Sequence, residues 1–142
     1  MILKNRKALH NYETKEMYSA GMVLPGWVVK AIRNGRVDLK DAYVRFEKEG
    51  SRAVVKNFKA TPEASTPLSY ITGGDEYPLL LTRAEMHRLW VKQQEGGVAF
   101  PVLGLTQKNG RFKLEFALAV GRKAFDKRRF EKKREWERRT KE

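Results

Sequence analysis

The clearest pattern in the chain is an alternation of apolar and polar side chains over residues 111–120. The apolar positions form one face of an extended segment: Phe112, Leu114, Phe116 and Leu118. Strict alternation of this kind predicts a half-buried β-strand. The apolar segment 98–106 precedes it, and Asn109-Gly110 supplies the residue types that a tight hairpin turn requires. The pattern therefore predicts a β-hairpin toward the C-terminal end.

Shorter segments rich in β-branched and aromatic residues predict further strands. These segments are residues 8–12, 17–24, 42–46 and 53–58. The last two are expected to pair through the charged turn 47–52. Residues 60–77 contain two prolines, three threonines and a Gly-Gly pair, and this composition indicates a long loop.

Two segments instead carry apolar side chains at three- and four-residue spacing, which predicts helices. The first runs from Pro25, a residue tolerated in the first helical turn, to Gly35, which suits the left-handed position after a helix. The second begins with Thr82 and Glu85, which match a capping box, and ends at the glycine pair 96–97.

About six strands with two inserted helices predict a mainly β fold. Residues 1–120 are long enough for one compact core, and a small, partly closed barrel like the oligonucleotide-binding (OB) fold has this number of strands. Residues 121–142 are expected to form a separate basic tail that stays disordered until it is bound.

The tail carries much of the chain's formal charge of +13, because it contains 11 Lys/Arg against 5 Asp/Glu. A segment with this many charges cannot bury enough apolar surface to offset the conformational entropy that it would lose on becoming ordered. Dense cations with interleaved aromatic residues are typical of RNA-binding segments. The alternatives are a solvated basic extension and an anionic membrane surface, although no apolar run is long enough for a spanning helix and no signal-peptide pattern opens the chain.

No catalytic constellation is evident in the sequence. His10 and His87 lack metal-ligand spacing to carboxylates, Asp38 and Asp41 flank Lys40 without a third acid, and cysteine is absent. We therefore expect a binding protein and not an enzyme, without a metal ion or another cofactor.

The N-terminal segment combines cations, an amide, an imidazole and a phenol over residues 5–12. Strand alternation would place Arg6, His10 and Tyr12 on one face, where the rings could stack on a base or ribose and Arg6 could contact phosphate. The alternative is that Tyr12 belongs to the core. Lys30 and Arg33 lie on the polar side of the first predicted helix, which is functional only if that helix lies beside the N-terminal segment.

Several motifs occur in a specific order along nearly the whole chain. They are Asn5-Arg-x-Ala-x-His-x-Tyr12, Ala20-Gly21, Leu24-x-Gly-x-x-Val29-Lys30, Arg33-x-Gly35, Leu39-x-Asp-x-Tyr43, Leu79-Leu-Leu81, Gly121-x-Lys123-x-x-Asp126-Lys127-Arg128 and Arg134-Glu-Trp136. In these motifs the sequence resembles the tmRNA-binding small protein B (SmpB) family. It departs from the usual pattern at Ser19 and Val28, where many members have Glu, and at Tyr77-Pro78.

The resemblance implies an OB-type barrel that holds the tRNA-like domain of transfer-messenger RNA (tmRNA). It implies a cytoplasmic protein that acts in trans-translation as a monomer in a one-to-one complex with tmRNA. Elongation factor Tu would deliver alanylated tmRNA with this protein to stalled ribosomes. The alternative function is a barrel that binds ribosomal or single-stranded nucleic acid without a rescue role.

The resemblance also implies two groups of site residues. The tmRNA-binding residues would be Asn5, Arg6, Lys7, His10, Tyr12, Gly26, Lys30 and Arg33. The tail would become helical in the vacant decoding centre and mRNA channel, using Lys123, Phe125, Asp126, Lys127, Arg128 and Trp136.

Overall fold

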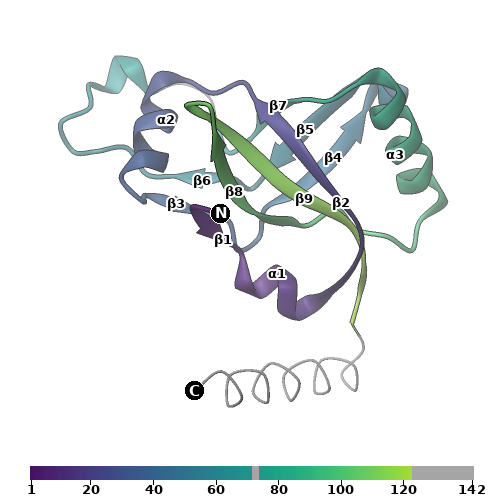
Figure 1. Cartoon of the computed structure of the whole chain (residues 1–142). Coiled ribbons are helices and arrows are strands. Elements are labelled where there is room, and N and C mark those ends of the chain that lie inside the picture. The colour runs from purple at the N-terminus through teal and green to yellow at the C-terminus, as the bar shows by residue number, and fades with distance from the viewer. Residues whose placement is uncertain (72–73, 123–142) are drawn as a thin grey trace, which may run out of the picture.

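The computed structural model describes residues 1–71 and 74–122. Within these ranges the fold is mainly β (Figure 1). The strands are β1 (Leu3–Lys4), β2 (Tyr12–Met22), β3 (Val37–Asp38), β4 (Tyr43–Glu47), β5 (Arg52–Lys56), β6 (Lys59–Ala60), β7 (Tyr77–Leu80), β8 (Val102–Lys108) and β9 (Arg111–Gly121). The helices are α1 (Arg6–Asn11), α2 (Gly26–Arg33), α3 (Arg83–Glu95) and the 3₁₀ helices η1 (Lys48–Gly50) and η2 (Leu68–Tyr70).

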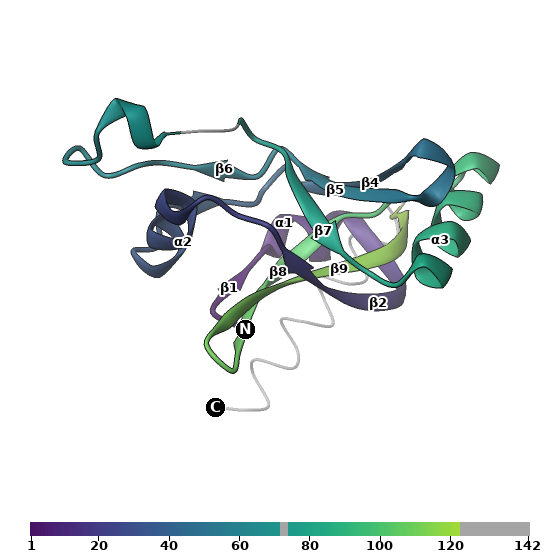
Figure 2. The same ribbon diagram turned by 90° about the horizontal axis from the view of Figure 1, so that it is seen from above.

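Seven of the described strands form one antiparallel sheet in the order β1-β8-β9-β2-β7-β5-β4. The outer edge of β4 returns to the segment before β8, where Val44 N donates to Phe100 O at 2.8 Å and Val102 N donates to Ala42 O at 3.2 Å. This seam closes six strands into a barrel, and β3 pairs with β6 in a small separate sheet. Figure 2 shows β4 and β5 on one side of the barrel and β2, β8 and β9 on the other. The expected mainly β barrel is confirmed.

The barrel interior holds one apolar core, built from inward-facing positions of every barrel strand. Phe46 lies at its centre, with its ring 5.0 Å from that of Phe100 in an edge-to-face arrangement and 6.4 Å from that of Phe116. The largest fully buried side chains are Phe46, Phe58, Phe116, Leu89, Leu105, Leu114, Val28, Val54, Val55 and Val102. Aromatic side chains dominate such cores because each removes a large apolar area from water.

The predicted C-terminal hairpin is confirmed. β8 and β9 pair in antiparallel register up to Lys108 and Arg111, and Asn109 and Gly110 form the turn with φ of 52° and 75°. Positive φ at both central positions gives the turn a twist that matches the strands. The pair formed by β4 and β5 is also confirmed, with η1 in place of a simple turn.

α3 begins and ends as its sequence predicts. Thr82 is the N-cap, and its Oγ1 accepts a hydrogen bond from Glu85 N at 3.2 Å. Near the other end of α3, the side chain of Gln93 donates a hydrogen bond to Phe46 O and accepts one from Phe46 N, both at 2.9 Å. These two bonds fix the helix against β4. Gly50 permits close packing of η1, because a Cβ there would lie 2.8 Å from the Cα of His87.

The expected strand at residues 8–12 is wrong, because most of this segment belongs to α1. β2 starts at Tyr12 and not at residue 17, and it ends at Met22. The described residues therefore contain three α-helices where two were expected. The expected loop 60–77 contains η2, and Tyr77 begins a strand that the sequence pattern did not predict.

Candidate nucleic-acid interface

α1 owes its position to Asn5, the one buried polar residue of the described chain. The Oδ1 atom of Asn5 accepts from Ala8 N at 3.3 Å and so caps the helix. Its Nδ2 donates to Leu39 O at 2.7 Å and to Val102 O at 2.8 Å. Because Asn5 is only 4% exposed and its amide is fully engaged, its side chain positions α1 and is not presented to a ligand.

Small side chains let α1 lie close against the outer surface of the barrel. Ala8 packs in a separate buried cluster with Leu103 of β8 and with Ala117 and Ala119 of β9. The ring of Tyr12 packs against this cluster and is half-buried. Tyr12 thus packs on the outer surface of the barrel and is not one of the buried core residues.

The polar residues of α1 face outward. Arg6 and Lys7 are exposed in its first turn. His10 lies four residues after Arg6, on the same side of the helix. Its Nδ1 lies 3.1 Å from Asn11 Oδ1. The expected strand face shared by His10 and Tyr12 is wrong, because the helix ends between them.

An ion pair connects α1 to the turn before β4. Lys7 Nζ lies 2.7 Å from Asp41 Oδ1, and both side chains are exposed to solvent. The hydrogen bond and charge of Asp41 raise the pKa of Lys7, and Lys7 in turn lowers the pKa of Asp41. A cleft of about 420 Å³ opens beside this pair, between α1 and β4, and it is also lined by Lys40, Tyr43 and Arg45.

α2 presents the second predicted group of cations. The helix begins after Pro25 and is followed by Gly35 at a φ of 70°, as predicted. Val28, Ala31 and Ile32 bury one face, which leaves Lys30 and Arg33 exposed on the other.

The N-terminal half of α2 lies beside the long loop. Lys30 Nζ lies 3.2 Å from Glu63 Oε2 of this loop. Gly26, Trp27 and Lys30 line a groove of about 700 Å³ together with residues 65–67, 69 and 70 of the loop. Tyr70 in this groove is 67% exposed, so the groove combines a cation with an accessible aromatic ring.

The two helices lie on one side of the molecule, connected by β1 and β3. Figure 1 shows α2 and β3 at the left, β1 and then α1 following toward the bottom of the barrel, and α3 at the right. One cleft joins residues 3–7 to residues 37–40, and another joins Ile2 and Leu3 to Arg33 and Gly35. We call this surface the basic side; its exposed cations are Lys4, Arg6, Lys7, Lys30, Arg33, Arg36, Lys40 and Lys59.

The structure thus brings the predicted cations of the N-terminal segment and those of the first predicted helix together on a single surface. Arg6, Lys7, Lys30 and Arg33 belong to the basic side, and Gly26 begins α2 beside Lys30. Sequence reasoning missed Tyr43, which lines the cleft beside α1, and Lys59 of β6. The Leu39-x-Asp-x-Tyr43 motif was the available signal for Tyr43, whereas the position of Lys59 follows only from the pairing of β3 with β6.

The predicted tail residues Lys123, Phe125, Asp126, Lys127, Arg128 and Trp136 lie outside the described residues. The start of the tail is fixed beside α1. Arg122 N donates to Asn11 O at 2.9 Å, and Arg122 Nε donates to Tyr12 O at 3.1 Å. The chain therefore leaves the barrel next to the basic side.

Residues 1–71 and 74–122 offer neither of two other kinds of site, a metal centre and a membrane-spanning helix. No three His, Asp or Glu side chains in these ranges gather closely enough to hold a metal ion. None of the helices there combines the length and the apolar character that crossing a bilayer requires.

Comparison with known proteins identifies the family. A sequence model of the SmpB protein family matches residues 2–142. The SsrA-binding protein of Azoarcus sp. (strain BH72) is 44% identical over 138 residues, covering 96% of this chain and 92% of that protein. The SsrA-binding protein of Thiobacillus denitrificans is 42% identical over 137 residues, covering 96% of this chain and 91% of that protein.

A comparison with solved structures points to the same family. It is described as "tmRNA-SmpB: a journey to the center of the bacterial ribosome", and one of its chains superposes on this protein with a TM-score of 0.69. The two chains are 31% identical, and the superposition covers 87% of each. With a family match over nearly its whole length, this chain belongs to the SmpB family.

Proposed function

We propose that this protein binds the tRNA-like domain of tmRNA and takes part in trans-translation, the rescue of stalled ribosomes. The observation that carries this proposal is the family match over residues 2–142, which includes the tail as well as the barrel. The names of the relatives, SsrA-binding proteins, and the solved tmRNA-SmpB structure support it. No catalytic step is required of the protein itself, and the role places it in the cytoplasm with the ribosomes.

The basic side is the proposed contact surface for tmRNA. Its lysines and arginines suit the phosphate backbone, and the shape of a folded RNA is read largely through such contacts. Arg6, Lys7, Lys30 and Arg33 would contact phosphates, and His10 would contact a base or ribose. Gly26 has open space around its Cα, so the RNA backbone could approach α2 closely there.

The tail has a separate proposed role on the ribosome. Its motif residues Lys123, Phe125, Asp126, Lys127, Arg128 and Trp136 would enter the vacant decoding centre and mRNA channel. A basic segment of this length gains a helix more readily on an RNA surface than alone in water. Elongation factor Tu would participate only through alanylated tmRNA, and one monomer would serve one tmRNA.

A truncation separates the two proposed roles. Because Arg122 bonds to Asn11 and Tyr12, the deletion should start after it and remove residues 123–142. We expect this variant to bind the isolated tRNA-like domain within a few fold of the full chain and to lose tagging on stalled ribosomes. Binding is measured by filter retention at fixed salt, and tagging in a reconstituted translation system.

Two results would contradict the proposal. Equal loss of binding and tagging would contradict the division of labour between barrel and tail. If the full chain bound unrelated structured RNA as tightly as the tRNA-like domain, the protein would be a general RNA-binding barrel.

A further inference from the structure

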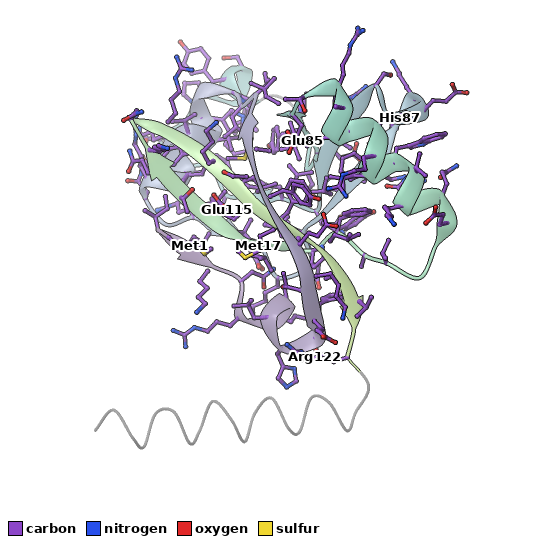
Figure 3. The ribbon with its side chains drawn as sticks, turned by 45° about the vertical axis from the view of Figure 1, so that its right-hand side comes forward. Met1, Met17, Glu85, His87, Glu115 and Arg122 are labelled. Carbon is purple, nitrogen blue, oxygen red and sulfur yellow. The ribbon has the colours of Figure 1, made fainter. Side chains whose placement is uncertain are left out.

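Part of the outer face of the barrel is left open beyond α1. α1 covers Ala117 and Ala119 of β9, whereas the preceding outward position, Glu115, is not covered by this helix. Ser19 of β2 and Gly104 of β8 lie directly opposite Glu115 in the two adjacent strands. Figure 3 shows Glu115 on the same side of these strands as Met1 and Met17.

Two hydroxyl groups hold the Glu115 carboxylate in place. Ser19 Oγ donates to Glu115 Oε1 at 2.8 Å, and Thr106 Oγ1 donates to the same oxygen at 2.9 Å. Among the described residues, no group bonds to Glu115 Oε2 and no cation lies within ion-pair distance of the carboxylate. Glu115 therefore presents an oriented carboxylate with one oxygen, Oε2, available to accept a further hydrogen bond.

Exposed apolar side chains surround this carboxylate. Met17 is 62% exposed, Leu80 61% and Met1 59%. Leu80 lies over Gly21, the next outward position of β2 after Ser19, and Met1 lies over Gly104. Such a rim offers apolar surface to the face of a base or a sugar beside the acceptor.

We propose that Glu115, oriented by Ser19 and Thr106, is a specificity-determining residue that accepts a hydrogen bond from a base amine or a ribose 2′-hydroxyl of the bound RNA. This inference rests on the proposed function and adds to it a contact outside the predicted site residues. RNA is the favoured ligand because the open face continues directly from α1 on the basic side.

The chemistry of this contact predicts discrimination and little gain in general affinity. A carboxylate repels phosphate, so it is satisfied only by an RNA that directs a neutral donor at it. RNAs that bind through phosphates alone meet an unfavourable charge at this position. Glu115 would thus disfavour unrelated RNA and reward the RNA that supplies the donor.

The test is whether Glu115→Gln, a substitution of nearly equal size, weakens or tightens the binding of RNA. Loss of a negative charge should on electrostatic grounds tighten binding to every RNA. We expect Glu115→Gln to weaken binding to a transcript of the tRNA-like domain about tenfold, the effect of one lost charge-assisted hydrogen bond. Binding to an unrelated structured RNA should be unchanged or tighter. The matched control is Glu95→Gln, which removes an exposed acid at the end of α3.

A second set of variants tests the role of the hydroxyls. Ser19→Ala and Thr106→Val should each reduce the preference for the tRNA-like domain in the same direction and to a smaller extent. Thermal unfolding of each variant shows whether the fold is intact. Equal weakening toward both RNAs, or binding by Glu115→Gln that is unchanged or tighter toward the tRNA-like domain, would overturn the inference.

Analogue interference identifies the donor. Transcripts carry either inosine, which lacks the guanine amine, or 2′-deoxynucleotides, which lack the ribose hydroxyl. A position that weakens binding to the wild-type protein and has no effect with Glu115→Gln marks the contact, as an amine or as a hydroxyl according to the analogue. If neither analogue gave such a position, direct acceptance by Glu115 from these groups would be refuted. A wild-type protein without preference for the tRNA-like domain would instead refute the proposed function.

Discussion

At the residue scale, Asn5 links three segments through one side chain. Asn5→Ala removes the cap of α1 and leaves two buried carbonyl oxygens without their donor. We expect the free energy of unfolding to fall by about 2–4 kcal/mol, from the loss of a cap and two buried hydrogen bonds. Urea unfolding measures this, with Gln94→Ala on the exposed side of α3 as the control. Weaker RNA binding at unchanged stability would instead show that Asn5 contacts RNA.

The Lys7–Asp41 ion pair predicts a different effect, on binding and not on stability. Because Lys7 lowers the pKa of Asp41, the pair persists above the ordinary carboxyl pKa and is lost as pH falls through the folded-state value. Both side chains are exposed to solvent, so stability should hardly change. Asp41→Asn leaves Lys7 uncompensated, and we expect tighter RNA binding with a steeper dependence on salt.

Titration of RNA affinity against salt concentration measures this effect. Acidification should mimic Asp41→Asn in the wild-type protein and have less effect in the variant. If Asp41→Asn bound RNA more weakly, Asp41 would be part of the contact and not a competitor for Lys7.

At the element scale, β1 approaches β8 over a glycine. A Cβ at Gly104 would lie 2.2 Å from Leu3 O, so Gly104→Ala must displace β1 and with it the start of α1. We expect a loss of about 1–3 kcal/mol in the free energy of unfolding and weaker RNA binding. Gly121→Ala is the control, because nothing lies within 4 Å of its Cβ position. Equal unfolding midpoints for the two variants in urea would contradict the close approach.

The elements with strong local signals could be predicted from the sequence. The β8–β9 hairpin follows from strict alternation and Asn109-Gly110, and α3 follows from its capping box and closing glycine. α1 could not be predicted in this way, because six residues are too few for a stable isolated helix and its position depends on buried contacts to Leu39 and Val102. β7 was missed because Pro78 is atypical of a strand interior.

The candidate site was predictable in composition and not in arrangement. Arg6, Lys7, Lys30 and Arg33 could be named from their residue types and from the family resemblance. Their common surface depends on β1 and β3, two-residue strands that have no pattern of their own. The open face around Glu115 depends on cross-strand register, which local sequence does not encode.

At the scale of the whole molecule, exposed cations occur on two opposite sides. The basic side lies opposite α3, which carries its own exposed cations, Arg83, Arg88 and Lys92. We expect Arg6→Ala, Arg33→Ala and Lys40→Ala to lower the salt dependence of RNA binding by about one unit of logarithmic slope each. Arg83→Ala and Lys92→Ala should leave the slope unchanged. Similar effects on both sides would place the RNA elsewhere.

The pairing of β2 between β7 and β9 has a consequence for how this protein is made. β2 finishes at Met22, yet its longest partner, β9, extends to Gly121. β2 lies near the N-terminus, and its partner β9 follows about a hundred positions later in the chain. The two strands therefore cannot pair while the residues of β9 are still being synthesised. Contacts so distant along the chain are formed slowly and leave unpaired edges open to aggregation in the meantime. Nascent fragments that stop before β9 should therefore remain unfolded. The protein should fold only after nearly the whole chain has emerged from the ribosome that synthesises it.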